Sequence, residues 1–204
     1  IRGTGVASDG KASSVMKPRV DGQLLALERA WRDSGVDPAT VGLVEAHGTA
    51  TPVGDDAELD TLARFFGPAT GEGPAGGRGV LGSVKSMIGH TMPAAGAAAL
   101  IKTALALHHG VLPPTLHVDD PHERLADTRF RTLATAEEWA ADGTARRAGV
   151  NAFGFGGINA HVVLEAAPAS TPVAPTPVVL APDLGARAPK SGARTEEGER
   201  VVLL

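Results

Sequence analysis

Two histidines and one lysine follow short apolar runs in this sequence, where side chains that carry chemistry are expected. His47 follows the run at 41–46, and Lys85 and His90 follow the run at 79–84. In open α/β sheets, ligands bind beyond the carboxyl ends of the strands. We therefore expect the two histidines to converge at one edge of a sheet, where a neutral imidazole can donate a hydrogen bond to a carbonyl oxygen.

A long apolar helix is predicted directly after His90. Residues 91–109 are nearly all Ala, Leu, Ile and Gly, apart from Lys102 and its neighbour, which predicts a helix buried on every face in a globular core. The run is too interrupted for a membrane span. Thr91 is expected to cap the first turn and Pro93 to fit within it, which would place His90 at the positive end of the helix dipole and keep its imidazole neutral.

Two further segments supply candidate binding groups. Thr49 and Thr51 follow the first histidine on the same loop, where their hydroxyls can hydrogen-bond a polar linker of a substrate. Residues 151–159 contain closely spaced glycines, which allow backbone N–H groups to face a ligand at short range. Phe153 and Phe155 flank these glycines as candidate gates.

The rest of the pattern predicts an α/β layered domain that positions these groups. Strands are predicted at 1–6, 41–46, 79–84, 129–133, 146–151 and 161–165, and helices at 21–35, 55–66 and 91–109. From Ala166 the composition changes to Pro, Ala, Thr and Ser, which predicts a flexible linker leading to a next module. Because the first residues lack a start methionine and read as a strand under way, we expect the chain to be a piece of a longer protein.

Composition excludes several classes of function. The 204 residues carry a net charge of -4 without a basic run, so no nucleic-acid partner is expected. The sequence has no cysteine, which excludes disulfides, thiolate metal sites and a cysteine nucleophile in this chain. Residues 5–11 nearly match a phosphate-binding loop but lack the following Ser or Thr, and the glycine pattern at 77–82 lies within a predicted strand. We expect a cytoplasmic protein with no membrane partner.

The histidines also lack the ligand spacing of a metal site. Asp55, Asp56 and Glu58 are the nearest candidate partners, but no tight ligand motif joins them to the histidines, so no metal is expected. Asp55 and Glu58 are expected instead to favour the N-terminus of their own helix.

Three segments together resemble the C-terminal half of a β-ketoacyl synthase, the condensing domain of fatty acid and polyketide synthases, which has the thiolase fold. They are residues 47–55, 82–90 and 151–161, in the family's order and spacing. The residues at 86–96 and the linker look more like a modular or iterative multidomain synthase, including the polyunsaturated-fatty-acid kind. The resemblance divides the chain into a core half at 1–118, the remaining strands with the glycine-rich segment at 119–165, and a linker at 166–204.

The resemblance implies decarboxylative Claisen condensation. An acyl chain moves onto an active-site cysteine, malonyl carried on acyl carrier protein loses carbon dioxide, and the resulting carbanion attacks the acyl thioester. His47 and His90 match the histidines that hold the malonyl thioester carbonyl and stabilise the enolate. Lys85 matches the lysine that supports the second histidine, and Thr49 and Thr51 match the threonines that bind phosphopantetheine.

The glycine-rich segment has its own implied role. Phe155 matches the gating residue whose backbone N–H completes the oxyanion hole, with Phe153 and Gly156 beside it. No cofactor is implied to bind covalently to this chain, because the substrate is carried on the phosphopantetheine of acyl carrier protein.

Two departures limit what this chain does alone. The family's cysteine belongs to an N-terminal half that is absent here, so the implied acyltransferase is incomplete. The expected partners are that cysteine-bearing half, acyl carrier protein and a second copy in a homodimer of the complete ketosynthase. Ala99 stands where many stand-alone members carry a glutamate.

Two other functions stay open. One is a non-catalytic module, either like a chain-length factor or for docking carrier protein. The other is a thiolase-like hydrolase or decarboxylase that uses the histidines without the cysteine. Retention of both histidines and Lys85 favours the condensing enzyme over a partner without chemistry.

Overall fold

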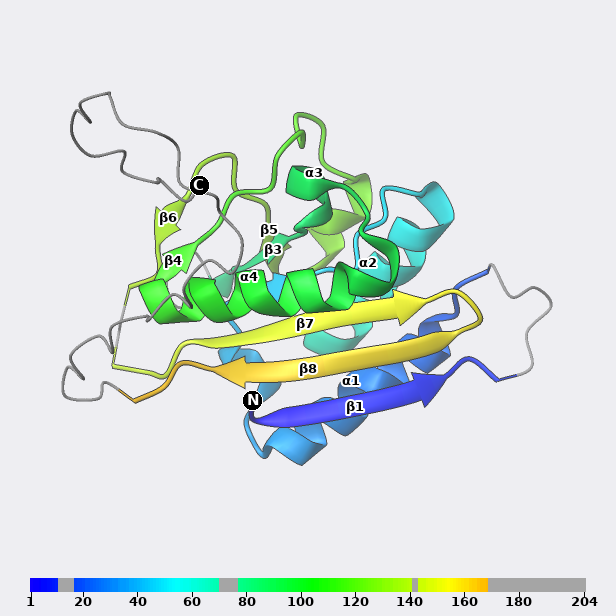
Figure 1. The fold of residues 1–204 in the computed structure, drawn as a ribbon, viewed down its shortest axis with the longest axis horizontal. Helices are drawn as coiled ribbons and strands as arrows, with labels where there is room; N and C mark the ends of the chain where they lie inside the picture. The colour runs from blue at the N-terminus through cyan, green and yellow to red at the C-terminus, as the bar shows by residue number, and fades with distance from the viewer. Residues whose placement is uncertain (11–16, 70–76, 141–142, 169–204) are drawn as a thin grey trace, which may run out of the picture. The chain divides into compact units, whose positions relative to one another are not determined.

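The computed structural model describes residues 1–10, 17–69, 77–140 and 143–168 (Figure 1). The strands are Gly3–Ser8 (β1), Leu43–Glu45 (β2), Gly79–Gly82 (β3), Val111–Leu112 (β4), Phe130–Arg131 (β5), Glu137–Glu138 (β6), Arg147–Gly154 (β7) and Ile158–Glu165 (β8). The α-helices are Val20–Ser34 (α1), Pro52–Phe66 (α2), Lys85–Ile88 (α3) and Ala95–His109 (α4), and the 3-10 helices are Pro38–Thr40 (η1), Met92–Ala94 (η3) and Glu123–Asp127 (η4). Most of the predicted linker, from residue 169 onward, lies outside the described residues.

One mixed sheet brings together strands from distant parts of the chain. Its order is β1-β8-β7-β2-β3-β5, and strands β7, β2, β3 and β5 run parallel to one another. Strands β1 and β7 pair with β8 in the antiparallel direction. Because β2 and β3 are parallel neighbours, the loops that follow them leave the sheet at the same edge. The predicted segments 1–118 and 119–165 both contribute strands to this sheet.

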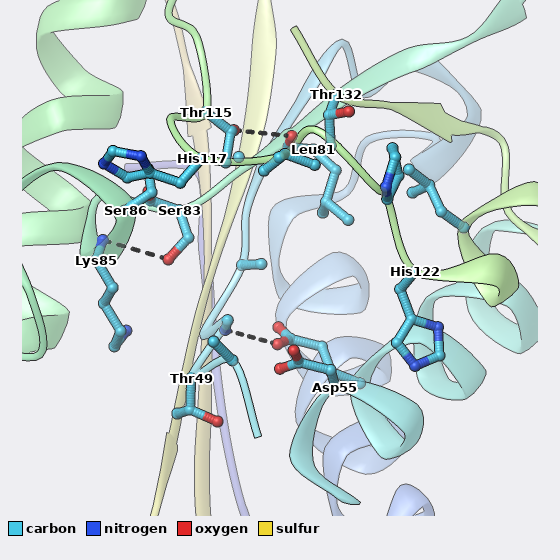
Figure 2. A pocket seen from close by; sticks show the side chains of 18 of the residues that line it. Thr49, Asp55, Leu81, Ser83, Lys85, Ser86, Thr115, His117, His122 and Thr132 are labelled. Carbon is cyan, nitrogen blue, oxygen red and sulfur yellow. Dashed lines mark hydrogen bonds between the residues drawn. The ribbon is translucent and has the colours of Figure 1, made fainter. Parts of the chain in front are cut away.

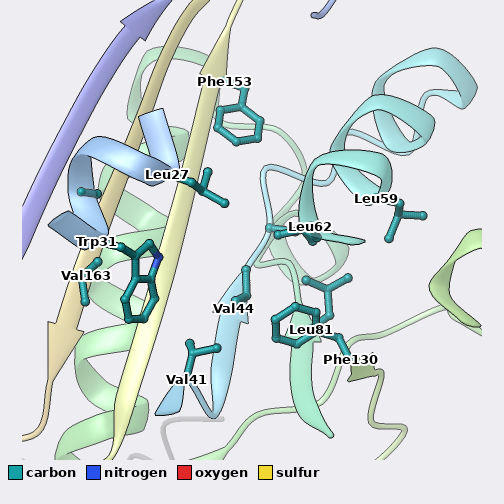
Figure 3. Close-up of a cluster of buried hydrophobic side chains, with 12 residues drawn as sticks. Leu27, Trp31, Val41, Val44, Leu59, Leu62, Leu81, Phe130, Phe153 and Val163 are labelled. Carbon is teal, nitrogen blue, oxygen red and sulfur yellow. The ribbon is translucent and has the colours of Figure 1, made fainter. Parts of the chain in front are cut away.

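The sheet face toward α1 and α2 carries one apolar cluster (Figure 3). Val44 and Leu81 point from the central strands into this cluster, where they meet Trp31 and Leu62 of the two helices. Leu62 and Val44 are fully buried. Burial of one such side chain stabilises the fold by ~1.5–3 kcal/mol.

The opposite sheet face carries a second cluster beneath α4. Leu43 and Val80 come from the central strands and pack with Ala99 and Leu107 of this helix. Successive residues of a strand point to opposite faces, so Leu43 and Val44 enter different clusters. The predicted α/β fold with α-β-α layers is confirmed, and Figure 1 shows α4 lying alongside β7 on the face opposite α1.

Helix α4 departs from its prediction in two ways. It buries one side against the sheet, while Ile101 and Leu105 on the other side are 60% and 52% exposed, so the expectation of burial on every face is wrong for this chain. It begins at Ala95 rather than at 91, because Met92 adopts a positive φ of 53° and starts a 3-10 turn. Thr91 makes no side-chain capping hydrogen bond.

No helix in the described ranges is long and apolar enough to cross a membrane.

Candidate active site

The two predicted histidines meet at the edge of the sheet. His47 lies on the loop after β2, and His90 lies after α3, on the connection that leaves β3. Their ring centroids are 5.6 Å apart and the rings are inclined by 86°, an edge-to-face arrangement. Two imidazoles at this separation can reach a single carbonyl group placed between them.

The hydrogen bonding of His90 fixes its tautomer. The backbone N–H of Met92 donates to His90 Nδ1 at 3.0 Å. Since that nitrogen accepts, a neutral imidazole here carries its proton on Nε2 and can donate from that atom. The dipole of the long helix was expected to keep this ring neutral, but α4 begins five residues beyond His90. The local turn at Met92, rather than the helix end, orients the ring.

His47 is held in the neutral form at neutral pH. Burial lowers its pKa from 6.5 to about 4, and the charge of Lys85 and any proton on His90 act in the same direction. A neutral ring can act as a hydrogen-bond donor without adding a second charge to the site.

A buried carboxylate anchors the His47 backbone. Glu58 is 5% exposed, and its two oxygens accept the N–H groups of His47 and Gly48, each at 2.8 Å. Burial raises the pKa of Glu58, whereas the N–H donors favour its charged form. Glu58 was expected to favour the N-terminus of its helix, and that expectation is wrong. It lies in the second turn of α2 and binds the loop after β2.

The anchor extends through three more buried side chains. Asn151 donates to Glu58 at 2.8 Å, and its oxygen lies 2.6 Å from His161 Nδ1. Trp31 Nε1 donates to His161 Nε2 at 3.0 Å, so Nδ1 carries the ring proton and donates to Asn151. Burial lowers the pKa of His161 to about 3. Sequence reasoning missed this network, because nothing in the spacing links Trp31 to the His47 loop.

Lys85 is the first residue of α3 and is half-buried. Burial lowers its pKa, and the nearby carboxylates Glu58 and Glu45 act in the opposite direction. Burial thus favours the neutral amine of Lys85, whereas the two carboxylates favour the ammonium.

Two cavities adjoin the loop after β2. One, of about 390 Å³, is lined by Lys85, His90, Thr49 and Asp55 together with residues of the 115–122 loop (Figure 2). The other, of about 270 Å³, is lined by residues from the other predicted groups, namely His47, Thr49, Thr51, Phe153, Phe155 and Glu58. Thr49, on the loop after β2, lines both cavities. The predicted site residues therefore lie around this one loop.

The two predicted threonines form one polar spot. Their Oγ1 atoms are 3.0 Å apart. Thr51 precedes α2 but makes no side-chain capping bond. A Cβ atom on Gly54 would contact Thr51 Oγ1 and lie 2.9 Å from Thr49 Oγ1, so glycine leaves room for both hydroxyls.

The two phenylalanines occupy different environments. Phe155 lies on the turn between β7 and β8 and is 68% exposed. Phe153 is 7% exposed, belongs to the core cluster and has its ring centroid 6.0 Å from that of His47. Gly156 and Gly157 have φ angles of +82° and +75°, which favour glycine in this turn. Phe155 thus lies exposed at the edge of the 270 Å³ cavity, whereas the buried ring of Phe153 lies next to that of His47.

The acidic residues near the site do not form a metal-binding cluster. Among the residues that the structure describes, no group of three or more His, Cys, Asp or Glu side chains is placed to hold a metal ion. Asp56 pairs instead with Arg124 at 3.2 Å and lies 3.5 Å from His122.

Two family models match consecutive parts of this chain. Residues 1–119 match the family model "Beta-ketoacyl synthase, C-terminal domain", and residues 120–203 match "Ketoacyl-synthetase C-terminal extension". The chain is 45% identical over 168 residues to a phenolphthiocerol/phthiocerol polyketide synthase of Mycobacterium bovis, covering 81% of this chain and 9% of that protein. It is 46% identical over 173 residues to a polyunsaturated fatty acid synthase of a Thraustochytrium species, covering 82% and 6%. The chain thus spans less than a tenth of these relatives.

Solved structures extend the comparison to the fold. A ketosynthase from module 6 of the bacillaene synthase of Bacillus subtilis superposes with a TM-score of 0.72 at 36% identity, covering 82% of this chain and 30% of that one. An oxazolomycin ketosynthase domain of Streptomyces albus gives a TM-score of 0.73 at 40% identity, covering 84% and 31%. The chain belongs to the β-ketoacyl synthase family, as the C-terminal ketosynthase domain of the kind found in polyketide and polyunsaturated fatty acid synthases.

Proposed function

We propose that this chain supplies the two histidines of an active β-ketoacyl synthase, an acyltransferase of the 3-oxoacyl-[acyl-carrier-protein] synthase type. The reaction is the decarboxylative Claisen condensation of an acyl thioester with malonyl-acyl carrier protein. The observation that carries the proposal is the edge-to-face pair of His47 and His90, 5.6 Å apart.

Each histidine contributes a hydrogen bond at the moment that negative charge develops. The malonyl thioester carbonyl binds between His47 and His90. As the carbon–carbon bond to the carboxylate breaks and carbon dioxide leaves, its electron pair forms an enolate, and the two imidazole N–H groups stabilise the oxyanion. The neutral state of His47 and the Nε2 tautomer of His90 suit both rings to this role.

The carbon–carbon bond then forms at the acyl thioester on a cysteine. The enolate carbon attacks the thioester carbonyl, the carbon–sulfur bond breaks, and the thiolate leaves. Because this chain has no cysteine, the proposal places the nucleophile on a separate, N-terminal half of the ketosynthase. The Phe155 N–H, in the turn with Gly156 and beside Phe153, is proposed to stabilise the acyl oxyanion.

Lys85 is proposed to act through its charge, and the two threonines are proposed to bind the substrate. The Lys85 ammonium shares a cavity with His90 and supports it by a positive potential. Thr49 and Thr51 present adjacent hydroxyls to the phosphopantetheine amides of the acyl carrier protein. No cofactor is proposed to bind covalently to this chain.

The outward face of α4 is proposed to pack against the cysteine-bearing half. Ile101 and Leu105 lie exposed on this face, and Met92 is 60% exposed just before the helix. A contiguous exposed apolar surface indicates an interaction site. Acyl carrier protein and a second copy of the complete ketosynthase are the other proposed partners, in the cytoplasm.

A non-catalytic role is the second candidate. One similar solved structure, with a TM-score of 0.73 at 38% identity over 82% of this chain, is titled a keto synthase-chain length factor. A module without chemistry, however, has no use for the buried network that holds the backbone of His47.

The test uses the complete ketosynthase that contains this chain and its cysteine-bearing half. Acyl-primed enzyme is mixed with malonyl-acyl carrier protein, and the β-ketoacyl product is measured by mass spectrometry. We expect product from the native protein and none from His47→Ala or His90→Ala, while Glu28→Ala, on the exposed side of α1, retains activity. Stable assembly without product favours the non-catalytic role, and carbon dioxide release from this chain alone favours a decarboxylase.

A further inference from the structure

One buried carboxylate links three segments of the chain. Glu45, the last residue of β2, is fully buried. Its Oε2 lies 2.8 Å from Lys102 Nζ of α4, and Lys102 has an 11% exposed side chain. Its Oε1 accepts the backbone N–H of Val84, between β3 and α3.

Each linked segment leads to one of the three candidate catalytic residues. His47 lies two residues after Glu45. Lys85 directly follows Val84. His90 precedes the turn into α4, the helix that carries Lys102. A shift of the Glu45 carboxylate would therefore change the placement of these residues relative to one another.

The chain makes room for this ion pair. A Cβ atom on Gly82 would lie 3.0 Å from Thr115 Oγ1, 3.4 Å from Lys102 Nζ and 3.9 Å from Glu45 Oε2. An alanine at position 82 would therefore crowd the Thr115 hydroxyl and lie in van der Waals contact with both members of the ion pair.

The burial of the pair requires an explanation other than stability. In the described part of the chain, every other ion pair has at least one partner whose side chain is 20% exposed or more. A buried ion pair seldom stabilises a fold more than well-packed apolar residues of similar size, because both charges lose their hydration. Its geometry, however, can specify one arrangement of the segments that it joins.

We propose that Glu45 and Lys102 are positioning residues for the condensation, holding the loop of His47, the start of α3 and α4 in the arrangement that the reaction requires. The inference rests on the proposed function and assigns two residues outside the histidine pair to it.

The same pair acts on Lys85 through charge. Glu45 raises the pKa of Lys85, as Glu58 does, against the lowering effect of burial. The ionisable groups around Lys85 are Glu45 from β2, Glu58 and Asp55 from α2, His47 and His90 from the histidine pair, and His117 and His122 from the cavity wall.

Substitutions separate charge from geometry. Glu45→Gln keeps an oxygen for the Val84 N–H but removes the negative charge and leaves the Lys102 cation unbalanced, so the pKa of Lys85 falls. Lys102→Met leaves the carboxylate unbalanced, so the pKa of Lys85 rises. Glu45→Asp keeps the charge but shortens the side chain by one methylene, which changes position more than charge.

The experiment measures kcat, KM and their pH dependence in the complete ketosynthase. We expect Glu45→Gln to lower kcat about 10-fold. We also expect the alkaline limb of the kcat–pH profile, which is taken to follow the pKa of Lys85, to move down by about one pH unit. Lys102→Met should move that limb upward, and Glu45→Asp should lower kcat with the limb in place. KM for malonyl-acyl carrier protein should change less than about twofold in all three. Glu137→Gln, which breaks the exposed pair with Arg131, is the matched control and should match the native enzyme.

A second readout does not depend on condensation. Competitive acetylation across a pH series, read by mass spectrometry at Lys85, reports the pKa of this lysine directly. Shifts of opposite sign in Glu45→Gln and Lys102→Met support the inference even if no product forms. Native kcat together with an unchanged Lys85 titration in folded variants overturns it and leaves the proposed function standing, whereas an inactive native enzyme overturns the proposed function alone.

Discussion

His47 meets His90 edge to face at a centroid separation of 5.6 Å, and a proton on the second ring would disfavour a proton on the first. Two histidines that were both charged would repel each other at this distance. Burial and Lys85 act in the same direction, and the pKa of His47 falls to about 4. The pair is therefore set up to donate hydrogen bonds rather than to carry two charges.

The pH dependence of the reaction follows from this shift. The pKa of His47 is lowered from 6.5 to about 4, so the ring stays neutral as pH falls through 6.5 and gains its proton only near pH 4. The kcat contribution of His47 should persist down to that range. Lys85→Met removes a nearby positive charge and should raise the pKa of His47, moving the acid limb upward. NMR titration of His47 in the complete ketosynthase checks this, with Arg64→Gln as a surface control. An unshifted His47 in Lys85→Met contradicts the prediction.

His161 links folding stability to pH. Its pKa is lowered from 6.5 to about 3, so the unfolded chain binds a proton that the folded chain does not. The contribution of His161 to the free energy of unfolding is complete above about pH 6.5. It falls as the pH drops toward 3, by on the order of 5 kcal/mol in total. His161→Gln should flatten the stability profile over this range, as urea unfolding across a pH series will show. A profile as steep as that of the native protein would exclude His161 as its source.

The Trp31 hydrogen bond should be costly to remove. Trp31→Phe leaves the acceptor nitrogen of buried His161 without its donor, which destabilises the fold by about 1–3 kcal/mol beyond the loss of packing. Trp139→Phe shortens the other tryptophan, in the cluster on the opposite sheet face, and controls for packing. Chemical denaturation of both variants gives the difference. Equal losses would mean that the hydrogen bond contributes little.

Glu58 should matter to activity through the His47 backbone. In Glu58→Gln, an NH2 group replaces one carboxylate oxygen and cannot accept the N–H of His47 or Gly48, so the loop moves. We expect kcat to fall about 10- to 100-fold with a smaller change in KM. Glu28→Gln, on the exposed side of α1, is the matched control. Steady-state kinetics with malonyl-acyl carrier protein measures both, and a native kcat in Glu58→Gln rules out this role.

Gly54 should govern substrate binding at the threonines. Gly54→Ala places a methyl group against the hydroxyls of Thr49 and Thr51, so we expect KM for malonyl-acyl carrier protein to rise by about 3- to 10-fold. Gly96→Ala, in the first turn of α4, meets only Ala152 at 3.5 Å and is the control. Kinetics that leave KM unchanged in Gly54→Ala would remove the threonine pair from the binding site.

Much of the framework could be predicted from sequence alone. Short apolar runs indicated the strands at 41–46 and 79–84, and the rule that parallel strands end at one edge placed His47 near His90. The start of α4 could not be predicted, because the left-handed backbone at Met92 interrupts a run that has strong helix-forming composition. The role of Glu58 was also out of reach, since its bonds depend on how the loop after β2 folds back over α2.

The exposed side of α4 was also not predicted from the sequence. The composition of the helix predicts burial on every side, but the described residues cover one side only, and Ile101 and Leu105 stay exposed. The apolar composition of this side thus has no packing partner among the described residues.

His47 and His90 are proposed to stabilise the enolate, and decarboxylation tests this role without the condensation step. The measurement is release of labelled carbon dioxide from malonyl-acyl carrier protein by the complete ketosynthase after its cysteine has been blocked by alkylation. We predict that release continues in the blocked native enzyme and falls by about 100-fold or more in His47→Ala and in His90→Ala, with Glu28→Ala unaffected. Release at the native rate from folded His47→Ala and His90→Ala variants would contradict the claim.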